Sequence, residues 1–356
     1  MGENNDQLVI FFVKEGALNS QQHSYPQSVL DGMGRNILQH IPKGATLKLG
    51  VSPLVFSVFP FLHECCNLGL HTDVYTESLF RLEIVGIINN SKKTIDRGRS
   101  VVSQAHGSQE LYDFMDRNPA FKVHPLSYVN DPQVMAKLDN FIAIIGALKL
   151  DLTGQVATDS IAHKFYGSVW SDDDSVTGAQ LSKGGKAIVV LQSKSLQGRS
   201  NLVFALPQGT GVSITRSDVE YVVTEYGTAY LYGKSICERC LALIDVAHPD
   251  FRLELLAQAK ANHYISSSQP GLSFRSKYPQ EFECLFTTTK TGRIVFCRPI
   301  KAAVDEDQLR SFFHKLSDRS VYLRYFCKLK SIAQRILQKT ADLDYWTAHF
   351  VHYCCG

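Results

Sequence analysis

Short apolar runs, separated by segments of mixed polarity, dominate the first two thirds of the chain. Buried strands are predicted at residues 43–50, 68–75, 141–152 and 187–192. The run at 141–152 lacks a clean alternation of apolar and polar positions, as expected for a strand covered on both faces. Helical segments separate the runs. This repeated alternation predicts an α/β fold with a largely parallel sheet.

The helical segments carry start and stop signals. We expect helices over residues 31–40, in a segment ending at Cys66, after Ser108, after Ser235 and from Pro249. Ser108 can cap the helix SQELYDFMD, which Asn118–Pro119 would end. Ser235 and Glu238 have the spacing of a capping box, in which the two residues bind each other's backbone amides.

The composition of the chain changes along its length and predicts four parts. The opening residues are expected to be irregular apart from a short strand at 8–13, and SSSQPG and KYPQ later mark a linker. The predicted parts are an N-terminal segment (1–30), a main domain (31–260), a linker (261–283) and a C-terminal segment (284–356).

Composition and charge exclude several classes of protein. Of the 356 residues, 44% are hydrophobic and 20% are charged, which is typical of a soluble globular protein. The net charge of +3 is too small to imply a nucleic-acid partner. The longest apolar run, residues 50–62, is interrupted by Pro53 and Pro60 and is too short to span a bilayer. The N-terminus has no basic segment leading into an apolar core, so we expect no secretory signal and a cytoplasmic location.

Nine cysteines are scattered along the chain, and without a secretory signal we expect reduced thiols. Cys237 and Cys240 form a CxxC motif inside the helix predicted after Ser235. Helix packing and a metal or redox role are both open for this pair. We favour packing, because the motif has no second pair beside it, and we predict no metal site.

Six motifs occur in order between residues 33 and 258. They are LGLHTD (68–73), YVNDP (128–132), ALKLDLTGQV (147–156), SKGGK (182–186), TEYGTAYLYGK (224–234) and IDVAHPDF (244–251). Together they resemble the C-terminal half of the acetyl-CoA hydrolase/CoA-transferase family. The resemblance implies a CoA-transferase-like open, mostly parallel sheet with flanking helices, in a protein built from two similar halves. Since the chain begins where the first half would have ended, we expect only the second half here.

The resemblance implies covalent catalysis by a carboxylate. In the family a glutamate attacks the acyl-CoA thioester, giving an enzyme anhydride and then an enzyme-CoA thioester. The matching residue here is Asp73, whose side chain is one methylene shorter, so its carboxylate would be set back by about 1 Å. A strand-end aspartate that binds backbone amides is the alternative. Glu77, four residues on, is a second carboxylate that could compensate.

The resemblance also implies a cradle for coenzyme A. Gly50 matches a GxGGxP turn in which Ser52 and Pro53 replace glycines, and Gly167 matches a GxGGQxD loop. In that second loop the paired glycines become Trp170 and Ser171, and Asp172 takes the place of glutamine. We interpret the acidic run that begins at Asp172 as a solvated loop.

Two further residues match positions of the family near its substrates. Lys183, in SKGGK, matches a lysine that contacts CoA, and a cation suits the CoA phosphates. Asn130 matches an asparagine near the reacting centre, where an amide can orient the thioester carbonyl. A surface lysine and an Asx-turn before Pro132 are the respective alternatives. Glu225 and Tyr226 are expected to organise the fold.

The C-terminal segment resembles the start of a GNAT-type N-acetyltransferase domain over residues 282–345. It predicts a hairpin at 287–298 and helices from Asp305 and Ser317. The pyrophosphate-binding loop of that fold is missing, so we expect no acetyltransferase activity. The end of the chain, from Asp344, is expected to lack a strand, as if truncated or frameshifted.

The sequence therefore predicts a CoA-transferase or acetyl-CoA hydrolase of acetate and acyl-CoA metabolism. Acyl-CoA and a small carboxylate would be the substrates, with coenzyme A carried as substrate and no tightly bound cofactor. The chain could form a homo-oligomer or receive the N-terminal half from a partner chain. The alternative is a non-catalytic CoA-binding remnant; acetyltransferase activity is disfavoured.

Overall fold

The computed structural model describes most of the first three quarters of the chain and parts of the remainder. The described residues are 25–167, 172–266, 284–287, 294–299, 311–313, 315–325 and 351–354. The chain divides into two compact units, Met1–Tyr264 and Ile265–Gly356. The predicted strand at 8–13 and most of the predicted linker lie outside the described residues.

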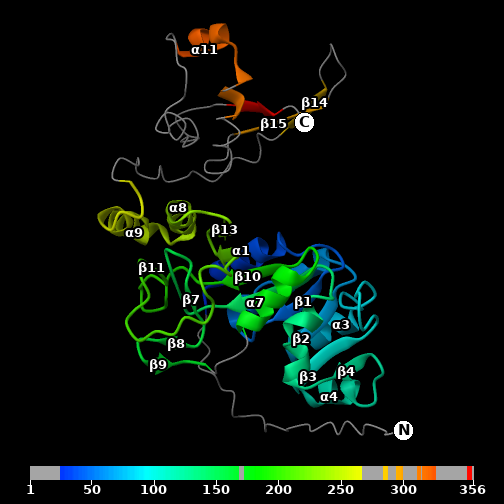
Figure 1. Cartoon of the computed structure of the whole chain (residues 1–356). Helices are drawn as coiled ribbons and strands as arrows, with labels where there is room; N and C mark the ends of the chain where they lie inside the picture. The colour runs from blue at the N-terminus through cyan, green and yellow to red at the C-terminus, as the bar shows by residue number, and fades with distance from the viewer. Residues whose placement is uncertain are drawn as a thin grey trace. The chain divides into compact units, whose positions relative to one another are not determined.

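The first unit is built on an eight-stranded sheet (Figure 1). In spatial order its strands are β13 (Gly227–Tyr230), β12 (Tyr221–Thr224), β10 (Lys186–Val190), β5 (Phe141–Gly146), β1 (Thr46–Leu49), β2 (Gly69–Thr76), β3 (Ser100–His106) and β4 (Phe121–Val123). Every neighbouring pair is parallel except β12 and β13. The predicted mostly parallel α/β sheet is confirmed.

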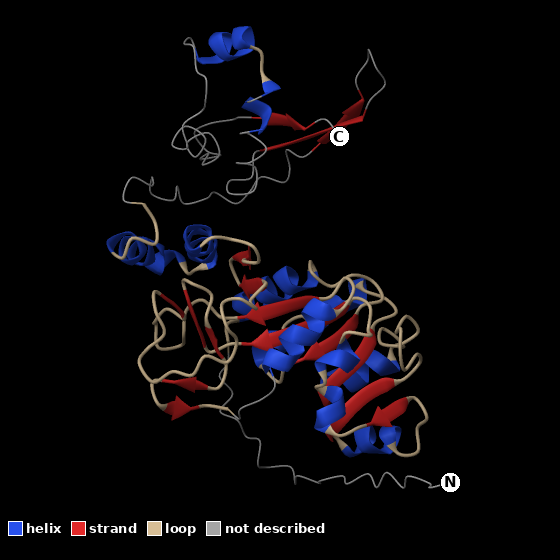
Figure 2. Ribbon diagram, viewed as in Figure 1, coloured by secondary structure: helices blue, strands red, loops and turns tan. Residues whose placement is uncertain are grey.

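Helices cover both faces of this sheet (Figure 2). They are α1 (Gln27–Leu38), α2 (Pro53–Phe56), η1 (Phe59–Glu64), α3 (Glu77–Ile84), α4 (Gln109–Met115), α5 (Leu126–Val129), α6 (Pro132–Met135), α7 (Asp172–Leu181), α8 (Ile236–Val246) and α9 (Pro249–Ala261). Ile142 and Ile144 of β5 pack in one core cluster with residues of α1, α2 and α3. Ala143 and Ile145 are buried as well but lie outside that cluster, on the face where α7 packs against β5.

Strand order reverses beside β1. The chain adds β2, β3 and β4 on one side of β1, and then β5, β10 and β12 on the other. The segments that follow β1 and β5 therefore leave neighbouring strands in opposite directions. In open parallel sheets this divergence opens a crevice at the carboxyl ends of the two strands, where ligands bind.

The predicted helix signals are largely confirmed. The Ser108 side chain accepts a hydrogen bond from the Leu111 amide, and Ser235 and Glu238 form the complete capping box. Helix α1 begins at Gln27 rather than at residue 31, directly after Pro26, whose ring fixes φ at a value that suits a helix start. The segment predicted to end at Cys66 is divided between α2 and η1.

The strand predicted over 141–152 is wrong in extent. Strand β5 ends at Gly146, and β6 (Lys149–Asp151) belongs to a three-stranded sheet with β7 (Val156–Ala157) and β11 (Leu202–Val203). The Asp151 carboxylate accepts hydrogen bonds from the amides of residues 153–155, which fixes a turn there. Nearby, β8 (Ser160–Ile161) and β9 (Lys164–Phe165) form a two-stranded ladder.

The second unit contains a three-stranded antiparallel sheet, β14 (Cys284–Thr287), β15 (Ile294–Pro299) and β16 (Val351–Cys354), and helix α11 (Asp318–Tyr325). The first two strands confirm the predicted hairpin, although its turn lies outside the described residues. Strand β16 contradicts the expectation that the end of the chain lacks a strand. Its residues VHYC include β-branched and aromatic side chains, which favour strands. Ser317 caps α11 as predicted, through the Ser320 amide.

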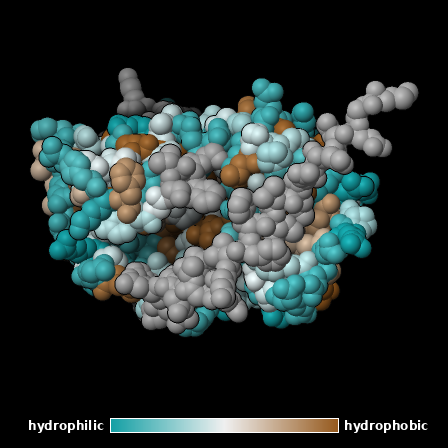
Figure 3. All heavy atoms as spheres, turned by 90° about the horizontal axis from the view of Figure 1, so that it is seen from below, coloured by the Kyte–Doolittle hydropathy of each residue, from teal (hydrophilic) through white to brown (hydrophobic). Residues whose placement is uncertain are grey.

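Some large apolar side chains of the described residues remain exposed. Figure 3 shows one face of the molecule, where brown hydrophobic residues form separate small patches among teal hydrophilic ones. Single exposed apolar residues of this kind are normal for folded proteins.

A buried histidine fastens α5 to the sheet. His71 of β2 is fully buried, and its Nε2–H donates to the Val129 carbonyl at the end of α5 over 2.8 Å. Burial lowers the pKa of His71 to about 4. This contact places Asn130, the residue that follows α5, beside β2.

Acidification should therefore weaken the fold through His71. Its folded pKa lies below the ordinary value, so between about pH 6.5 and pH 4 the unfolded chain binds the proton more readily than the folded chain. The free energy of unfolding should fall over that window by up to about 1.4 kcal/mol per pH unit. Urea unfolding at pH 7 and pH 5 should show a smaller loss in His71→Gln than in the wild type.

The variant should keep some acid sensitivity, because burial also lowers the pKa of His40 to about 4. The exposed His163 supplies the control, since His163→Gln should lose as much stability as the wild type. Equal losses in the wild type and His71→Gln would contradict the assignment.

Candidate functional site

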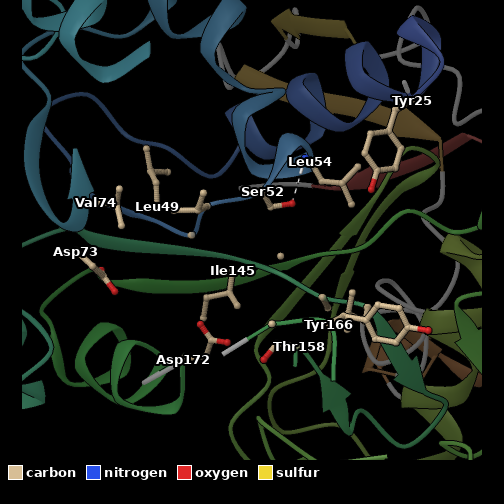
Figure 4. A pocket seen from close by; sticks show the side chains of 16 residues that line it. Tyr25, Leu49, Ser52, Leu54, Asp73, Val74, Ile145, Thr158, Tyr166 and Asp172 are labelled. Carbon is tan, nitrogen blue, oxygen red and sulfur yellow. Dashed lines mark hydrogen bonds between the residues drawn. The ribbon is translucent and has the colours of Figure 1, made fainter. Parts of the chain in front are cut away.

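A pocket of about 300 Å³ lies in the crevice where the strand order reverses (Figure 4). Residues 49–52 at the end of β1 and residues 145–148 at the end of β5 form two of its walls. Asp73 and Val74 of β2 line it as well, and Asp172 contributes from the start of α7. The divergence of β1 and β5 thus creates a binding site at the carboxyl edge of the sheet.

Asp73 lies in this pocket in contact with two polar side chains. It forms an ion pair with Lys48 of β1, and the side chains of Lys48 and Asp73 are 7% and 16% exposed. The Lys48 ammonium also donates to the Asn130 Oδ1 atom over 2.6 Å, and the Asn130 amide approaches the second Asp73 oxygen at 3.4 Å. The three side chains form a closed polar cluster, which holds the Asp73 carboxylate in place.

The register of β1 and β2 creates this cluster. Thr46 pairs with Gly69 and Leu47 with Leu70, so Lys48 lies beside His71. Residues two apart on a strand share a face, which puts Asp73 within reach of Lys48. Burial lowers the pKa of Lys48, and the Asp73 carboxylate opposes that shift.

Two adjacent residues of the motif YVNDP, Asn130 and Asp131, have different roles. Asp131 caps α6 by accepting a hydrogen bond from the Gln133 amide over 2.8 Å, so Asp131 makes the turn before Pro132. Asn130 is buried and its side chain reaches Lys48 and Asp73. The Asx-turn alternative therefore does not apply to Asn130.

The altered glycine turn after β1 folds without strain. A Cβ on Gly50 would lie 3.4 Å from the Ile144 carbonyl, and one on Gly146 would lie 2.9 Å from the Ser52 Cβ. A Cβ on Gly146 would therefore crowd Ser52, whereas a Cβ on Gly50 would make an ordinary van der Waals contact. Ser52 accepts a hydrogen bond from the Leu54 amide and caps α2, and Pro53 stands at the first position of that helix, where no amide is needed.

The first and last residues of the segment 167–172, the second glycine loop, line the pocket. Gly167 and Asp172 line the pocket, whereas Trp170 and Ser171 lie outside the described residues. The interpretation of the acidic run as a solvated loop is wrong, because Asp172 begins α7, where the helix dipole favours acidic side chains. Burial raises the pKa of Asp172.

The structure does not bring Lys183 to the pocket. Lys183 is exposed and precedes β10, and its carbonyl accepts a hydrogen bond from the Asn140 amide at the start of β5. The pocket lies at the other end of β5, which a strand of this length separates by roughly 15–20 Å. A contact of Lys183 with CoA stays a prediction. Glu77, the carboxylate that could have compensated for the short side chain of Asp73, accepts hydrogen bonds from Ser108 and Arg81. Glu77 does not line the pocket.

Sequence reasoning missed Lys48. A single lysine inside the predicted strand TLKL carries no motif, yet all four residues of this strand are buried. A cation in a buried strand needs an anionic partner, and this requirement is the signal that could have identified Lys48.

Several other expectations concern groups outside the pocket. Cys240 is buried and its thiol contacts the Leu152 carbonyl at 3.3 Å, in agreement with packing of the CxxC helix. Glu225 accepts hydrogen bonds from the Ser193 amide and hydroxyl, as expected of a residue that organises the fold. Within the described part of the chain no cluster of three or more His, Cys, Asp or Glu residues could hold a metal. No helix among the described residues is long and apolar enough to cross a membrane.

Comparison with curated proteins shows relatives that carry CoA-transferase names. The chain is 41% identical over 229 residues to the 4-hydroxybutyrate coenzyme A transferase of Clostridium kluyveri, covering 64% of this chain and 53% of the relative. It is 36% identical over 238 residues to the succinyl-CoA:cyclohexane-1-carboxylate CoA transferase of Geobacter metallireducens, covering 67% and 54%. The chain spans about half the length of the curated relatives it matches.

Comparison with solved structures shows that the fold is similar to that of CoA-transferases and of RipA. RipA from Yersinia pestis superposes with a TM-score of 0.64 at 36% identity, covering 72% of this chain and 56% of that protein. The 4-hydroxybutyrate CoA-transferase of Porphyromonas gingivalis gives a TM-score of 0.58 at 35% identity, covering 66% and 56%. Residues 107–259 match the family described as acetyl-CoA hydrolase/transferase C-terminal domain. This part of the chain therefore matches the C-terminal domain of acetyl-CoA hydrolases and transferases, and the strands that carry Lys48 and Asp73 precede the matched residues.

Proposed function

We propose that the chain supplies the nucleophile-bearing half of an acyl-CoA:carboxylate CoA-transferase, with Asp73 as nucleophile. The observation that carries this proposal is the Asp73 carboxylate, held by Lys48 and Asn130 in a pocket at the carboxyl edge of the sheet. A partly buried carboxylate whose lysine and asparagine partners fix its position is suited to attack a thioester. The CoA-transferase names of the relatives favour transfer to a carboxylate, and hydrolysis is the same chemistry with water as acceptor.

The reaction would proceed in balanced steps through Asp73. One carboxylate oxygen attacks the thioester carbonyl carbon, the C–S bond breaks, and an acyl-aspartyl anhydride and a CoA thiolate form. The thiolate then attacks the Asp73 carbonyl carbon, which releases the first carboxylate and leaves an aspartyl-CoA thioester. An acceptor carboxylate attacks that thioester, releasing the thiolate and forming a second anhydride. The thiolate takes the new acyl group, and free Asp73 is restored.

Lys48 and Asn130 would act on different charges in this cycle. Lys48 balances the negative charge of Asp73 in the resting site, and the charge that develops on the carbonyl oxygen during attack. Asn130 would orient the carbonyl through its amide. Both groups are held before substrate arrives, so little reorganisation is needed at the reacting centre.

A partner chain or a second copy would complete the active site. The relatives are about twice as long as the matched segment, and this chain aligns with about half of each. We propose that the acyl-CoA and the carboxylate bind between the pocket of this chain and a second chain. We also propose that the reaction takes place in the cytoplasm and involves neither a nucleic acid nor a membrane.

The alternative is a CoA-binding module without catalysis. The observation that favours it is the ion pair, because Lys48 binds the carboxylate that would have to attack the thioester. The short side chain of Asp73 points in the same direction. Acetyltransferase activity is not proposed, because much of the segment that resembles GNAT domains lies outside the described residues.

Acyl exchange distinguishes these possibilities. The purified chain, mixed with acetyl-CoA and isotopically labelled acetate, should place label in the CoA ester, measured by mass spectrometry. Asp73→Ala should abolish the exchange, and Asp73→Asn should do the same while preserving side-chain shape. Asp73→Glu should keep or raise it, because the longer arm moves the carboxylate forward by about 1 Å. Label transfer that persists in Asp73→Ala would contradict the role of Asp73. The absence of exchange in the wild type and Asp73→Glu would favour the binding module or a half-enzyme that lacks its partner chain.

Substitution of Lys48 tests its role in holding Asp73. Lys48→Gln should lower the exchange rate roughly tenfold to 100-fold, because Asp73 loses its cationic partner. Lys48→Arg should retain more activity, since it keeps the charge. Lys92→Gln provides a matched control, because Lys92 is exposed and remote from the pocket lining. Circular dichroism must show folded protein in each case, and unchanged rates in folded Lys48→Gln would exclude the proposed role.

A further inference from the structure

The pocket contains a second carboxylate besides the nucleophile. Asp73 belongs to β2, and Asp172 is the first residue of α7. Both side chains line the same pocket. Figure 4 shows these two side chains toward one end of the pocket, with Tyr25 at the other. Asp172 takes no part in the reaction steps proposed above, so its position calls for a separate explanation.

The charges around the pocket are predominantly negative. None of the described residues that line it is Lys, Arg or His. A nearby cation is Lys48, which already contacts both Asp73 and Asn130. The negative charges of Asp172 and Asp174 also act on Lys48, although only Asp73 forms an ion pair with it.

The remaining walls are largely apolar. Leu49, Leu54 and Ile145 line the pocket between its acidic end and Tyr25, and Val74 lies beside Asp73. Such walls suit a short hydrocarbon chain, which gains by leaving water. Thr158 lies beside Asp172, and its hydroxyl together with the Asp172 carboxylate could bind a hydroxyl group on that chain.

We infer that Asp172 is a specificity-determining residue, which restricts the pocket to monocarboxylic acyl groups and excludes dicarboxylic ones. The inference rests on the proposed function and names its substrate class. A butyryl or hydroxybutyryl group presents a neutral tail to Asp172. A succinyl group presents a second carboxylate to a pocket with two acidic side chains and no basic residue among its described lining.

The size of the expected discrimination follows from Coulomb's law. Two like charges about 5 Å apart, at the effective dielectric constant of a protein surface, disfavour binding by more than about 100-fold. Salt and water in an open pocket reduce this effect, so a preference of at least about tenfold for the monocarboxylate is expected. Removing the charge of Asp172 should remove most of that preference.

Competition between two acceptors tests the inference. The full chain receives acetyl-CoA with equal concentrations of ¹³C-labelled butyrate and ¹³C-labelled succinate, and mass spectrometry measures the ratio of labelled butyryl-CoA to succinyl-CoA. The wild type should favour butyryl-CoA by at least about tenfold. Asp172→Asn should lower the ratio severalfold, and Asp172→Gln, which places a neutral amide on a side chain one methylene longer, should act in the same direction.

Asp173→Asn is the matched control, because Asp173 is the exposed neighbour in the same helical turn and does not line the pocket. It should leave the ratio unchanged. A wild type that forms succinyl-CoA as readily as butyryl-CoA would overturn the inference. So would folded Asp172→Asn and Asp172→Gln proteins that keep the wild-type ratio.

A binding measurement separates this inference from the proposed function. Calorimetric titration with butyryl-CoA and with succinyl-CoA should show the same preference in affinity, and the same loss of preference in Asp172→Asn. If that pattern appears without any acyl exchange, the selectivity of Asp172 stands and the catalytic proposal fails. If exchange occurs but neither measurement discriminates between the two acyl groups, the catalytic proposal stands and this inference fails.

Discussion

The ion pair between Lys48 and Asp73 is the interaction on which the site depends. It exists because β1 and β2 pair in parallel with Thr46 opposite Gly69, which brings a lysine and an aspartate to the same face of adjacent strands. An isolated charge at this depth would be costly, and removing one member of a buried pair typically costs about 3–5 kcal/mol. Lys48 and Asp73 therefore each need the other's opposite charge. Asn130, which directly follows α5, completes the cluster.

The sheet topology gives this cluster a pocket. Since β1 and β5 are neighbours whose following segments diverge, their carboxyl ends leave a crevice beside Asp73. Gly146 leaves room for Ser52, which a Cβ at that position would crowd. The replacement of further glycines by Ser52 and Pro53 is accommodated, since these residues start a short helix and leave the crevice open. The altered turn is therefore compatible with a functional site.

Much of this arrangement could be predicted from the sequence, because it rests on local signals. Ordered motifs identified Asp73, Gly50, Gly167 and Asn130, and strand and helix periodicity gave the parallel sheet. The role of Lys48 could not be predicted, because a lysine in a strand acquires a partner only when strand register is known. Asp172 was misinterpreted for a similar reason: helix α7 covers Asp172 in part and leaves its neighbour Asp173 exposed. The pairing of β16 with β15 likewise depends on contacts between distant segments. Lys183 lies at the end of β10 that is remote from the pocket, and a motif match alone does not show whether a residue reaches the site.

The proposed reaction requires Asp73 to form a covalent bond with coenzyme A. The most direct measurement is mass spectrometry of the intact chain mixed with acetyl-CoA and quenched in acid, followed by digestion and peptide mapping. We predict an added mass equal to coenzyme A less one water, located on the peptide that contains Asp73 and absent from Asp73→Asn. A chain that binds acetyl-CoA without forming this adduct, or an adduct on another residue, would contradict the account.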